Sequence, residues 1–135
     1  MTSTALQRIL LVEDELDIQM VASMALEDLG GFQVEVCSSG REALEKIGVF
    51  SPQLILLDVM MPELDGPGTL AELDRRFPDR PPVIFMTARA QTSEVEEYRQ
   101  SGAIDVITKP FDPMSLADTV LDIWQRHQGG SSTTP

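Results

Sequence analysis

Five short apolar runs, rich in Ile, Leu and Val, recur along the chain and limit its possible folds more than any other feature. They are Ile9–Val12, Phe32–Cys37, Leu54–Leu57, Val83–Met86 and Ile104–Ile107, of which Phe32–Cys37 alternates between apolar and polar residues. Runs that are apolar on both faces are typical of parallel strands covered by helices on both sides. The stretches between them have helical spacing and predict helices at about 16–29, 39–49, 66–76, 91–101 and 113–127.

The alternation of strand and helix predicts a doubly wound α/β domain. Right-handed crossovers favour a flavodoxin-like, five-stranded parallel sheet of order 2-1-3-4-5 with five helices. Helix-end signals agree with this assignment. Ser39 and Glu42 have the spacing of a capping box, and Asp112-Pro113 is typical of a helix start. Glycines at 30, 31 and 102 follow the first and fourth helices, where a left-handed residue is common.

The length of 135 residues suits one domain, which we expect over 8–127, between flexible tails at 1–7 and 128–135. The single cysteine, Cys37, excludes an intramolecular disulfide, and no apolar run approaches the length of a membrane helix. A net charge of −12 opposes direct binding to nucleic acid or to an anionic membrane. Together these features predict a cytoplasmic domain.

Chemically reactive polar residues directly follow the first, third, fourth and fifth apolar runs. Glu13 and Asp14 follow the first run, Asp58 the third, Thr87 the fourth, and Thr108-Lys109 the fifth. In an open α/β sheet the binding crevice lies at the carboxyl ends of the strands, where the strand order reverses. With the order 2-1-3-4-5, that point brings the three carboxylates together and places the Thr87 hydroxyl and the Lys109 ammonium beside them.

This group of side chains predicts phosphoryl chemistry. Three adjacent carboxylates repel one another, so either their pKa values rise or a cation lies among them. Oxygen ligands alone favour a hard ion, Mg²⁺ above all. A carboxylate can also act as a nucleophile towards phosphorus, and the metal, Lys109 and Thr87 could neutralise the transferred group.

These residues closely resemble a response-regulator receiver domain over about 7–127. The motifs are Glu13-Asp14, Asp58 within LLDVMMPELDG, Thr87-Ala88, and Lys109-Pro110-Phe111. The resemblance implies that Asp58 accepts a phosphoryl group from a histidine kinase or a histidine phosphotransfer protein. It also implies that Mg²⁺ is bound by the Asp14 and Asp58 side chains and the Met60 backbone carbonyl, with Glu13 acting through water.

The resemblance further assigns phosphoryl binding and switching to Thr87, the Ala88 backbone and Lys109, and it favours a cis peptide bond between Lys109 and Pro110. The output surface would be the fourth helix, fifth strand and fifth helix, which would control a downstream protein or a fused output domain. A phosphorylation-dependent dimer is compatible with this. Beyond transfer to Asp58 and slow loss from it, no enzyme activity is expected.

The sequence departs from the family pattern in two places. Val106 stands where the family often has Tyr or Phe, so a rotating aromatic ring at this position cannot report a movement of Thr87. Met60 and Arg89 occupy two positions tied in the family to the lifetime of the phosphoryl group. Met60 offers no group to orient an attacking water, so we predict slow self-hydrolysis.

The first predicted helix carries two apolar faces. One is expected to face the core, with Ile18, Val21, Ala22, Ala25, Leu26 and Leu29; the second, with Leu16, Met20 and Met24, lies opposite. The second face is either a set of stray exposed residues or a docking surface for a partner helix. We expect docking by Leu16, Ile18, Met20, Met24, Pro110 and Phe111.

Other functions fit the sequence less well. An aspartate-based phosphatase needs a second Asp two residues after the nucleophile, where this chain has Met60. A flavin-binding domain of the same fold needs a hydroxyl-rich phosphate loop, which Glu13-Asp14-Glu15 does not supply. A phosphorylation-independent interaction module stays open as the alternative. A stand-alone receiver is favoured over an excised one, although the Gly-Gly-Ser-Ser-Thr-Thr-Pro end would also suit a linker.

Overall fold

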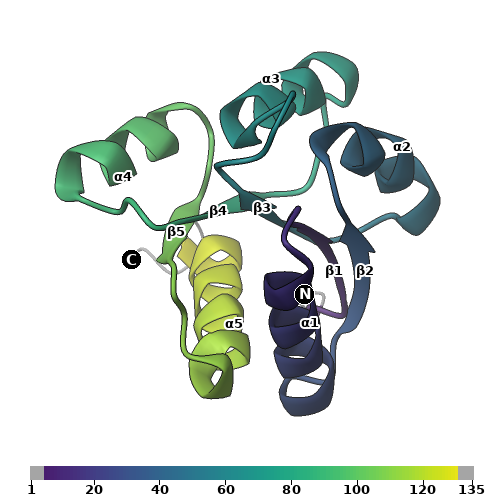
Figure 1. Cartoon of the computed structure of the whole chain (residues 1–135), viewed down its shortest axis with the longest axis vertical. Helices are drawn as coiled ribbons and strands as arrows, with labels where there is room; N and C mark the ends of the chain where they lie inside the picture. The colour runs from purple at the N-terminus through teal and green to yellow at the C-terminus, as the bar shows by residue number, and fades with distance from the viewer. Residues whose placement is uncertain (1–4, 131–135) are drawn as a thin grey trace.

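Five parallel strands form one sheet in the order β2-β1-β3-β4-β5, as the computed structural model shows for residues 5–130 (Figure 1). The strands are β1 (Arg8–Val12), β2 (Gln33–Cys37), β3 (Leu54–Asp58), β4 (Val83–Thr87) and β5 (Asp105–Thr108). The predicted sheet order is confirmed. The observed strand bounds differ from the predicted ones by about one residue, and Asp58 and Thr87 are the last residues of their strands.

Helices cover both faces of the sheet. They are α1 (Leu16–Met24), α2 (Gly40–Phe50), α3 (Gly66–Arg76), α4 (Thr92–Gln100) and α5 (Pro113–Gly130), and a π-helical turn, η1 (Ala25–Leu29), continues α1. α1 and α5 lie on one face, and α2, α3 and α4 lie on the other (Figure 1). Within 5–130, no helix combines the length and the hydropathy that a membrane span requires.

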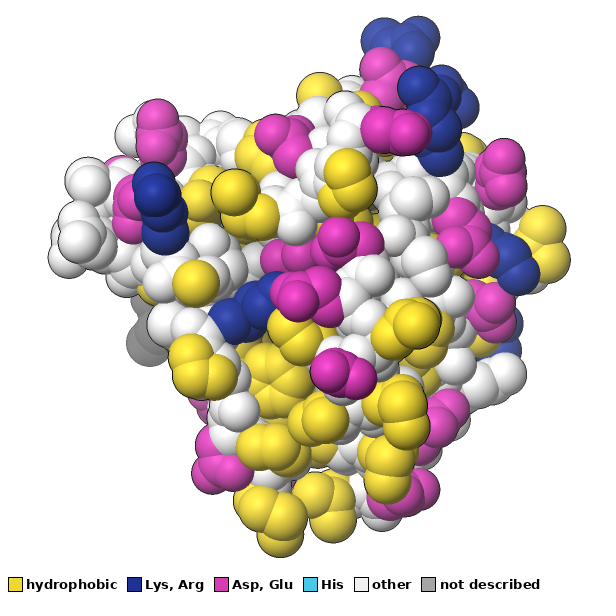
Figure 2. Space-filling model, viewed as in Figure 1, with side chains coloured by type: hydrophobic (Ala, Val, Ile, Leu, Met, Phe, Trp, Pro, Cys, Tyr) yellow, Lys and Arg dark blue, Asp and Glu magenta, His cyan; other side chains and the backbone are white. Residues whose placement is uncertain are grey.

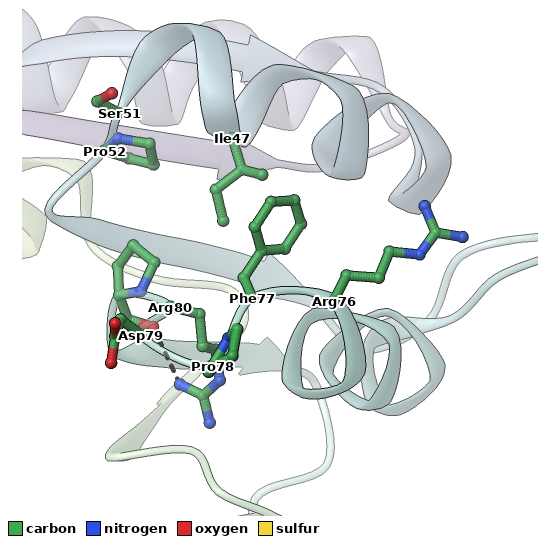
Figure 3. A pocket seen from close by; sticks show the side chains of 9 residues that line it. Ile47, Ser51, Pro52, Arg76, Phe77, Pro78, Asp79 and Arg80 are labelled. Atoms are coloured by element: carbon green, nitrogen blue, oxygen red, sulfur yellow. Dashed lines mark hydrogen bonds between the residues drawn. The ribbon is translucent and has the colours of Figure 1, made fainter.

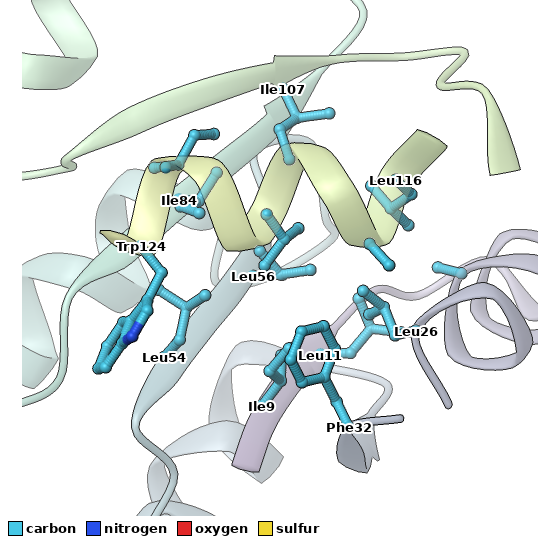
Figure 4. Close-up of a cluster of buried hydrophobic side chains, with 14 of the residues drawn as sticks. Ile9, Leu11, Leu26, Phe32, Leu54, Leu56, Ile84, Ile107, Leu116 and Trp124 are labelled. Atoms are coloured by element: carbon cyan, nitrogen blue, oxygen red, sulfur yellow. The ribbon is translucent and has the colours of Figure 1, made fainter. Parts of the chain in front are cut away.

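Each face of the sheet has its own hydrophobic core. β1 and β3 are buried on both faces, so alternate residues along each strand enter different cores. Figure 4 shows the core under α1 and α5, where Leu54 of β3 lies beside Trp124 and Leu11 of β1 lies near Phe32 and Leu26. These cores hold the two central strands, and with them the carboxyl ends that carry Glu13 and Asp58.

The predicted helix ends are mostly confirmed. The Ser39 hydroxyl accepts a hydrogen bond from the Glu42 backbone N–H (3.1 Å), and the Asp112 carboxylate accepts one from the Met114 backbone N–H (3.0 Å). Gly31 and Gly102 adopt positive φ angles of 72° and 118°. These caps satisfy backbone groups that a helix end otherwise leaves without partners.

The folded region extends further at both ends than the expected 8–127. Leu6 is buried in the core, and Gln53 accepts a hydrogen bond from the Gln7 backbone and donates one to the Ala5 carbonyl. At the other end α5 continues to Gly130. Residues 1–4 and 131–135 of the two predicted tails lie outside the described residues.

The predicted core face of the first helix is partly wrong. Ala22, Ala25 and Leu26 are buried as expected, but Val21 and Leu29 are 42% and 54% exposed. The helix turns into η1 at Ala25, and a π turn advances each residue through a smaller angle than an α-helical turn does. The prediction assumes a rotation of 100° per residue along the whole helix. Because the π turn rotates less per residue, Leu29 points away from the core.

Candidate functional site

Glu13, Asp14 and Asp58 converge at the carboxyl ends of β1 and β3. One carboxylate oxygen from each lies within 4.8 Å of the others. Parallel pairing of the two strands brings their ends to one edge of the sheet. The Glu13 and Asp58 side chains are buried, and Asp14 is half-buried. The predicted crevice is therefore present, with three carboxylates drawn from two neighbouring strands.

Backbone hydrogen bonds continue the sheet past the strand ends and fix the residues that carry the side chains. The Glu13 N–H donates to the Cys37 carbonyl (2.9 Å) and the Lys109 N–H to the Thr87 carbonyl (2.8 Å). Asp58 itself pairs in register with Met86 of β4. The site is consequently anchored to the ends of the paired strands.

Lys109, the residue after β5, reaches the buried carboxylates at the carboxyl ends of β1 and β3. Its Nζ donates to Glu13 Oε1 (3.0 Å) and to Asp58 Oδ1 (3.1 Å). Burial lowers the pKa of the Lys109 ammonium, but these two ionic hydrogen bonds outweigh it, so its pKa lies above the ordinary value. Lys109 therefore stays protonated beside Asp58. The Lys109–Pro110 peptide bond is cis, as the resemblance implies.

The Glu13 carboxyl is the strongly perturbed acid of the site. Burial raises its pKa to about 7, although hydrogen bonds from the Glu15 backbone and from Lys109 act in the opposite direction. Three acidic groups facing one ammonium leave an excess of negative charge in a confined space. An oxygen-only, carboxylate-rich cluster of this kind fits a hard divalent cation such as Mg²⁺. The donor set is thus suited to a metal ion.

Thr87 ends β4 beside this cluster, with its side chain buried. Its hydroxyl oxygen accepts a hydrogen bond from the Arg89 backbone N–H (3.0 Å). Ala88 and Arg89 are exposed in the loop that follows, and the Met60 side chain is 71% exposed after β3. The structure thus places Thr87 at the end of β4, Ala88 in the β4–α4 loop and Met60 in the β3–α3 loop.

The residues expected to dock a partner lie beside the crevice. Leu16, Met20 and Met24 are exposed along α1, and Ile18 and Phe111 are half-buried. Ile18, Pro110 and Phe111 line a shallow hollow between α1 and the β5–α5 loop. In Figure 2, acidic side chains gather at the middle of this face, next to basic ones, and a broad apolar patch extends below them over α1 and the start of α5.

Sequence reasoning missed two residues that hold the site in place. The buried Gln19 of α1 donates to the Glu13 carbonyl (2.5 Å) and to the Ser38 hydroxyl (2.9 Å). Gly66 packs against the backbone of Asp58 and Val59, where a Cβ atom would lie 2.7 Å from the Asp58 carbonyl oxygen. Gly66 follows Asp65 in a turn-like Asp-Gly pair, but no sequence signal indicates a buried role for Gln19.

A second hollow lies at the opposite rim of the sheet, between α2 and the α3–β4 loop, and is lined by Ile47, Phe77 and three prolines among others (Figure 3). Its arginines are already engaged. Arg76 pairs with Glu72, and Arg80 pairs with Asp74 and donates to the carbonyls of Pro81 and Gly102. None of the predicted site residues lines it, so the chemistry is concentrated at the carboxyl ends of the strands.

Comparisons with known proteins agree with this geometry. A family model for the response regulator receiver domain matches residues 9–121. The chain is 40% identical over 109 residues to the regulatory protein AtoC of Escherichia coli, covering 81% of this chain and 23% of that protein. It is 36% identical over 125 residues to the response regulator Rre1 of Synechocystis, covering 91% of this chain and 54% of that protein.

Among solved structures, the receiver domain of the Francisella response regulator 1452 superposes with a TM-score of 0.79 at 30% identity, covering 90% of this chain and 98% of that one. The chain thus spans only part of the curated relatives, but nearly all of a solved receiver domain. The fold, the strand-end carboxylates and the family match lead to one conclusion: this chain belongs to the receiver domains of two-component response regulators.

Proposed function

We propose that this chain is a phosphorylation-dependent switch in which Asp58 accepts a phosphoryl group from a phosphohistidine of a histidine kinase or a histidine phosphotransfer protein. The observation that carries the proposal is the hydrogen bond from Lys109 to Asp58 within a cluster of three carboxylates at the ends of β1 and β3. A buried carboxylate that is held by an ammonium and flanked by two more acids is suited to phosphoryl transfer.

In the proposed step, a carboxylate oxygen of Asp58 forms a bond to phosphorus while the phosphorus–nitrogen bond of the donor breaks. The electron pair stays on the imidazole nitrogen, which then takes up a proton. Lys109 lies where its ammonium can balance part of the charge on the new acyl phosphate. Its raised pKa keeps it charged throughout the physiological range.

Mg²⁺ is the cofactor that this donor set favours. Asp14 and Asp58 would bind it through their carboxylates and Met60 through its backbone carbonyl, and Glu13 would act through water. When bound, the ion would neutralise charge on the phosphoryl oxygens. The close approach of three acidic side chains supports this assignment.

Thr87 is the proposed switch residue. Its hydroxyl would turn from the Arg89 backbone N–H towards the phosphoryl group, and the Ala88 N–H would donate to the same group. The resulting displacement of the β4–α4 loop would alter the surface of α4, β5 and α5, to which a downstream protein or an output domain would respond. The greater length of AtoC and Rre1 is compatible with a fused output domain.

The exposed side of α1 is the proposed docking surface for the phosphodonor. Leu16, Met20 and Met24 are 70%, 62% and 56% exposed, and they lie next to the hollow lined by Pro110 and Phe111. Methionine adapts to irregular contacts, and such a surface fits the apolar stripe of a helix. We place this encounter in the cytoplasm, where histidine kinases present their phosphohistidine.

The test is to incubate the protein with acetyl phosphate and Mg²⁺ and to follow its intact mass. Wild type is expected to gain one phosphoryl group, whereas Asp58→Asn, or wild type with the metal chelated, gains none. Asp79→Asn, which removes an exposed carboxyl group at the opposite rim, is the matched control and should be labelled like wild type. A phosphorylation-independent interaction module would show no labelling in any of these samples.

A further inference from the structure

α4 is the least anchored helix of the described chain. None of its residues is buried, and in Figure 1 it stands away from α2 and α3. Among its side chains, Tyr98 is the one that packs against the core on this face of the sheet. The position of α4 on the domain therefore depends strongly on what Tyr98 contacts.

Tyr98 contacts the strand that carries Thr87. Its ring meets the ring of the fully buried Phe85 edge-to-face, with centroids 5.2 Å apart and an interplanar angle of 68°. This is a favourable arrangement for two aromatic rings, because the positive edge of one faces the negative face of the other. Phe85 lies two residues before Thr87 on β4, so the two side chains leave the strand on the same side.

Phe85 also pairs in register with Val106 of β5, the position where related receivers often carry an aromatic ring. Val106 is half-buried in the same cluster as Phe85 and Tyr98. In this chain the aromatic contact on that side of β4 is thus supplied by α4 and not by β5.

The two ends of α4 are held differently. At its C-terminal end, Arg99 pairs with Asp105 of β5 (3.1 Å), and the Ser101 hydroxyl donates to the Tyr98 carbonyl (2.7 Å). At its N-terminal end the loop borders an open, largely polar hollow lined by Ala88, Arg89, Ala90, Gln91, Glu94 and Thr108. The loop is tied back through the bond from the Arg89 N–H to the Thr87 hydroxyl, and this bond is lost if the hydroxyl turns away.

We propose that the packing of Tyr98 on Phe85 couples the position of α4 to the state of Thr87. Loss of the Arg89–Thr87 bond frees the β4–α4 loop to move into the hollow, and α4 pivots about its Asp105-held end. The Tyr98 ring then repacks on Phe85. This inference rests on the proposed phosphorylation of Asp58 and assigns to Tyr98 the reporting role that Val106 cannot fill.

The chain contains a single tyrosine, so incorporation of 3-fluorotyrosine gives one ¹⁹F resonance that belongs to Tyr98. On phosphorylation with acetyl phosphate and Mg²⁺, this resonance is expected to shift by more than its linewidth in wild type, in proportion to the phosphorylated fraction measured by mass. In Thr87→Val, which lacks the hydroxyl, the phosphorylated protein should keep the unphosphorylated shift. Phe77→Leu, in the same cluster but lining the hollow at the opposite rim of the sheet, is the matched control and should respond like wild type.

A second measurement uses hydrogen exchange at the α4 amides. Phosphorylation should change their exchange in wild type and in Tyr98→Phe, which keeps the ring, but not in Tyr98→Ala. Two results would overturn the coupling and leave the proposed function intact. One is full phosphorylation of wild type without a change in the Tyr98 resonance. The other is a change in that resonance on phosphorylation of Thr87→Val as large as the change in wild type. Absence of phosphorylation by mass would overturn both.

Discussion

Gly66, the first residue of α3, shows how closely the backbone is packed behind the phosphoacceptor. Its N–H donates to the Val59 carbonyl (2.9 Å), which folds the β3–α3 loop back against the end of β3. A Cβ atom at this position would lie 2.7 Å from the Asp58 carbonyl oxygen and 2.8 Å from the Val59 Cα atom. Both neighbours are backbone atoms, so a methyl group can be accommodated only if the strand end moves.

Gly66→Ala is therefore expected to destabilise the fold by about 1–3 kcal/mol, the usual cost of overpacking, and to slow phosphorylation of Asp58. Gly48→Ala is the control, because Gly48 lies in α2 with no atom within 4 Å of an added Cβ. There alanine should stabilise the protein by up to about 1 kcal/mol. Urea unfolding followed by the fluorescence of the single, buried Trp124 measures both effects. Equal stabilities for the two variants would contradict the close packing at Gly66.

The second single-residue prediction concerns Met60 and the rate at which phosphorylated Asp58 is hydrolysed. Its exposed thioether cannot orient water towards a phosphorylated Asp58. Met60→Asn adds an amide, and one positioned hydrogen bond of about 1 kcal/mol corresponds to a roughly five- to tenfold faster hydrolysis. Loss of the phosphoryl group, followed by mass after removal of the donor, measures the rate. A rate that rises little would remove the basis for the predicted slow self-hydrolysis.

At the level of elements, the strand ends of the site were predictable and the helix faces were predictable only in part. Asp58 and Thr87 follow apolar runs that pair as parallel strands, so chain order alone places them at one edge of the sheet. The burial of Gln19 was not predictable from the sequence. It depends on tertiary hydrogen bonds from the Gln19 amide to the Glu13 carbonyl and the Ser38 hydroxyl. Leu29 was misassigned because the π turn at Ala25 changes the phase of the helix.

Exposure of the apolar side of α1 leads to the third prediction. The double variant Met20→Asp and Met24→Asp should slow phosphotransfer from a phosphorylated histidine phosphotransfer domain by about 30-fold or more, because roughly 2 kcal/mol of apolar burial is lost on docking. Labelling by acetyl phosphate should be unchanged. Val49→Asp is the control, since Val49 is 83% exposed on α2, away from this surface. Undiminished transfer to the double variant would exclude α1 as the docking surface.

For the whole molecule, the sheet separates two cores, and Cys37 at the end of β2 is buried in the core that includes α2. Burial, reinforced by the nearby negative charges of Glu42 and Glu35, raises the pKa of the Cys37 thiol from 9.0 to about 12. The folded state therefore retains a proton that the unfolded chain releases above pH 9. Because the unfolded chain then binds fewer protons, stability falls as the pH rises through this range.

The fourth prediction follows from this linkage. Between pH 9 and 12, the thiol should contribute a loss of up to about 1.4 kcal/mol of unfolding free energy per pH unit, and nothing below pH 8. Cys37→Ala lacks this contribution, so its stability should decline less steeply while all other groups titrate alike. Urea unfolding of both proteins at several pH values gives the difference, and parallel curves would show that the thiol ionises equally in both states.

The sheet order also carries the central claim, because it is the pairing of β1 with β3 that brings Asp14 and Glu13 to Asp58. The most direct test is to identify the phosphorylated residue chemically. Borohydride reduces an aspartyl phosphate to homoserine, so protein treated with acetyl phosphate and Mg²⁺, reduced and digested, should contain homoserine at position 58 and aspartate at position 14. Homoserine at another position, or aspartate retained at 58 in protein that carries the phosphoryl mass, would contradict the account.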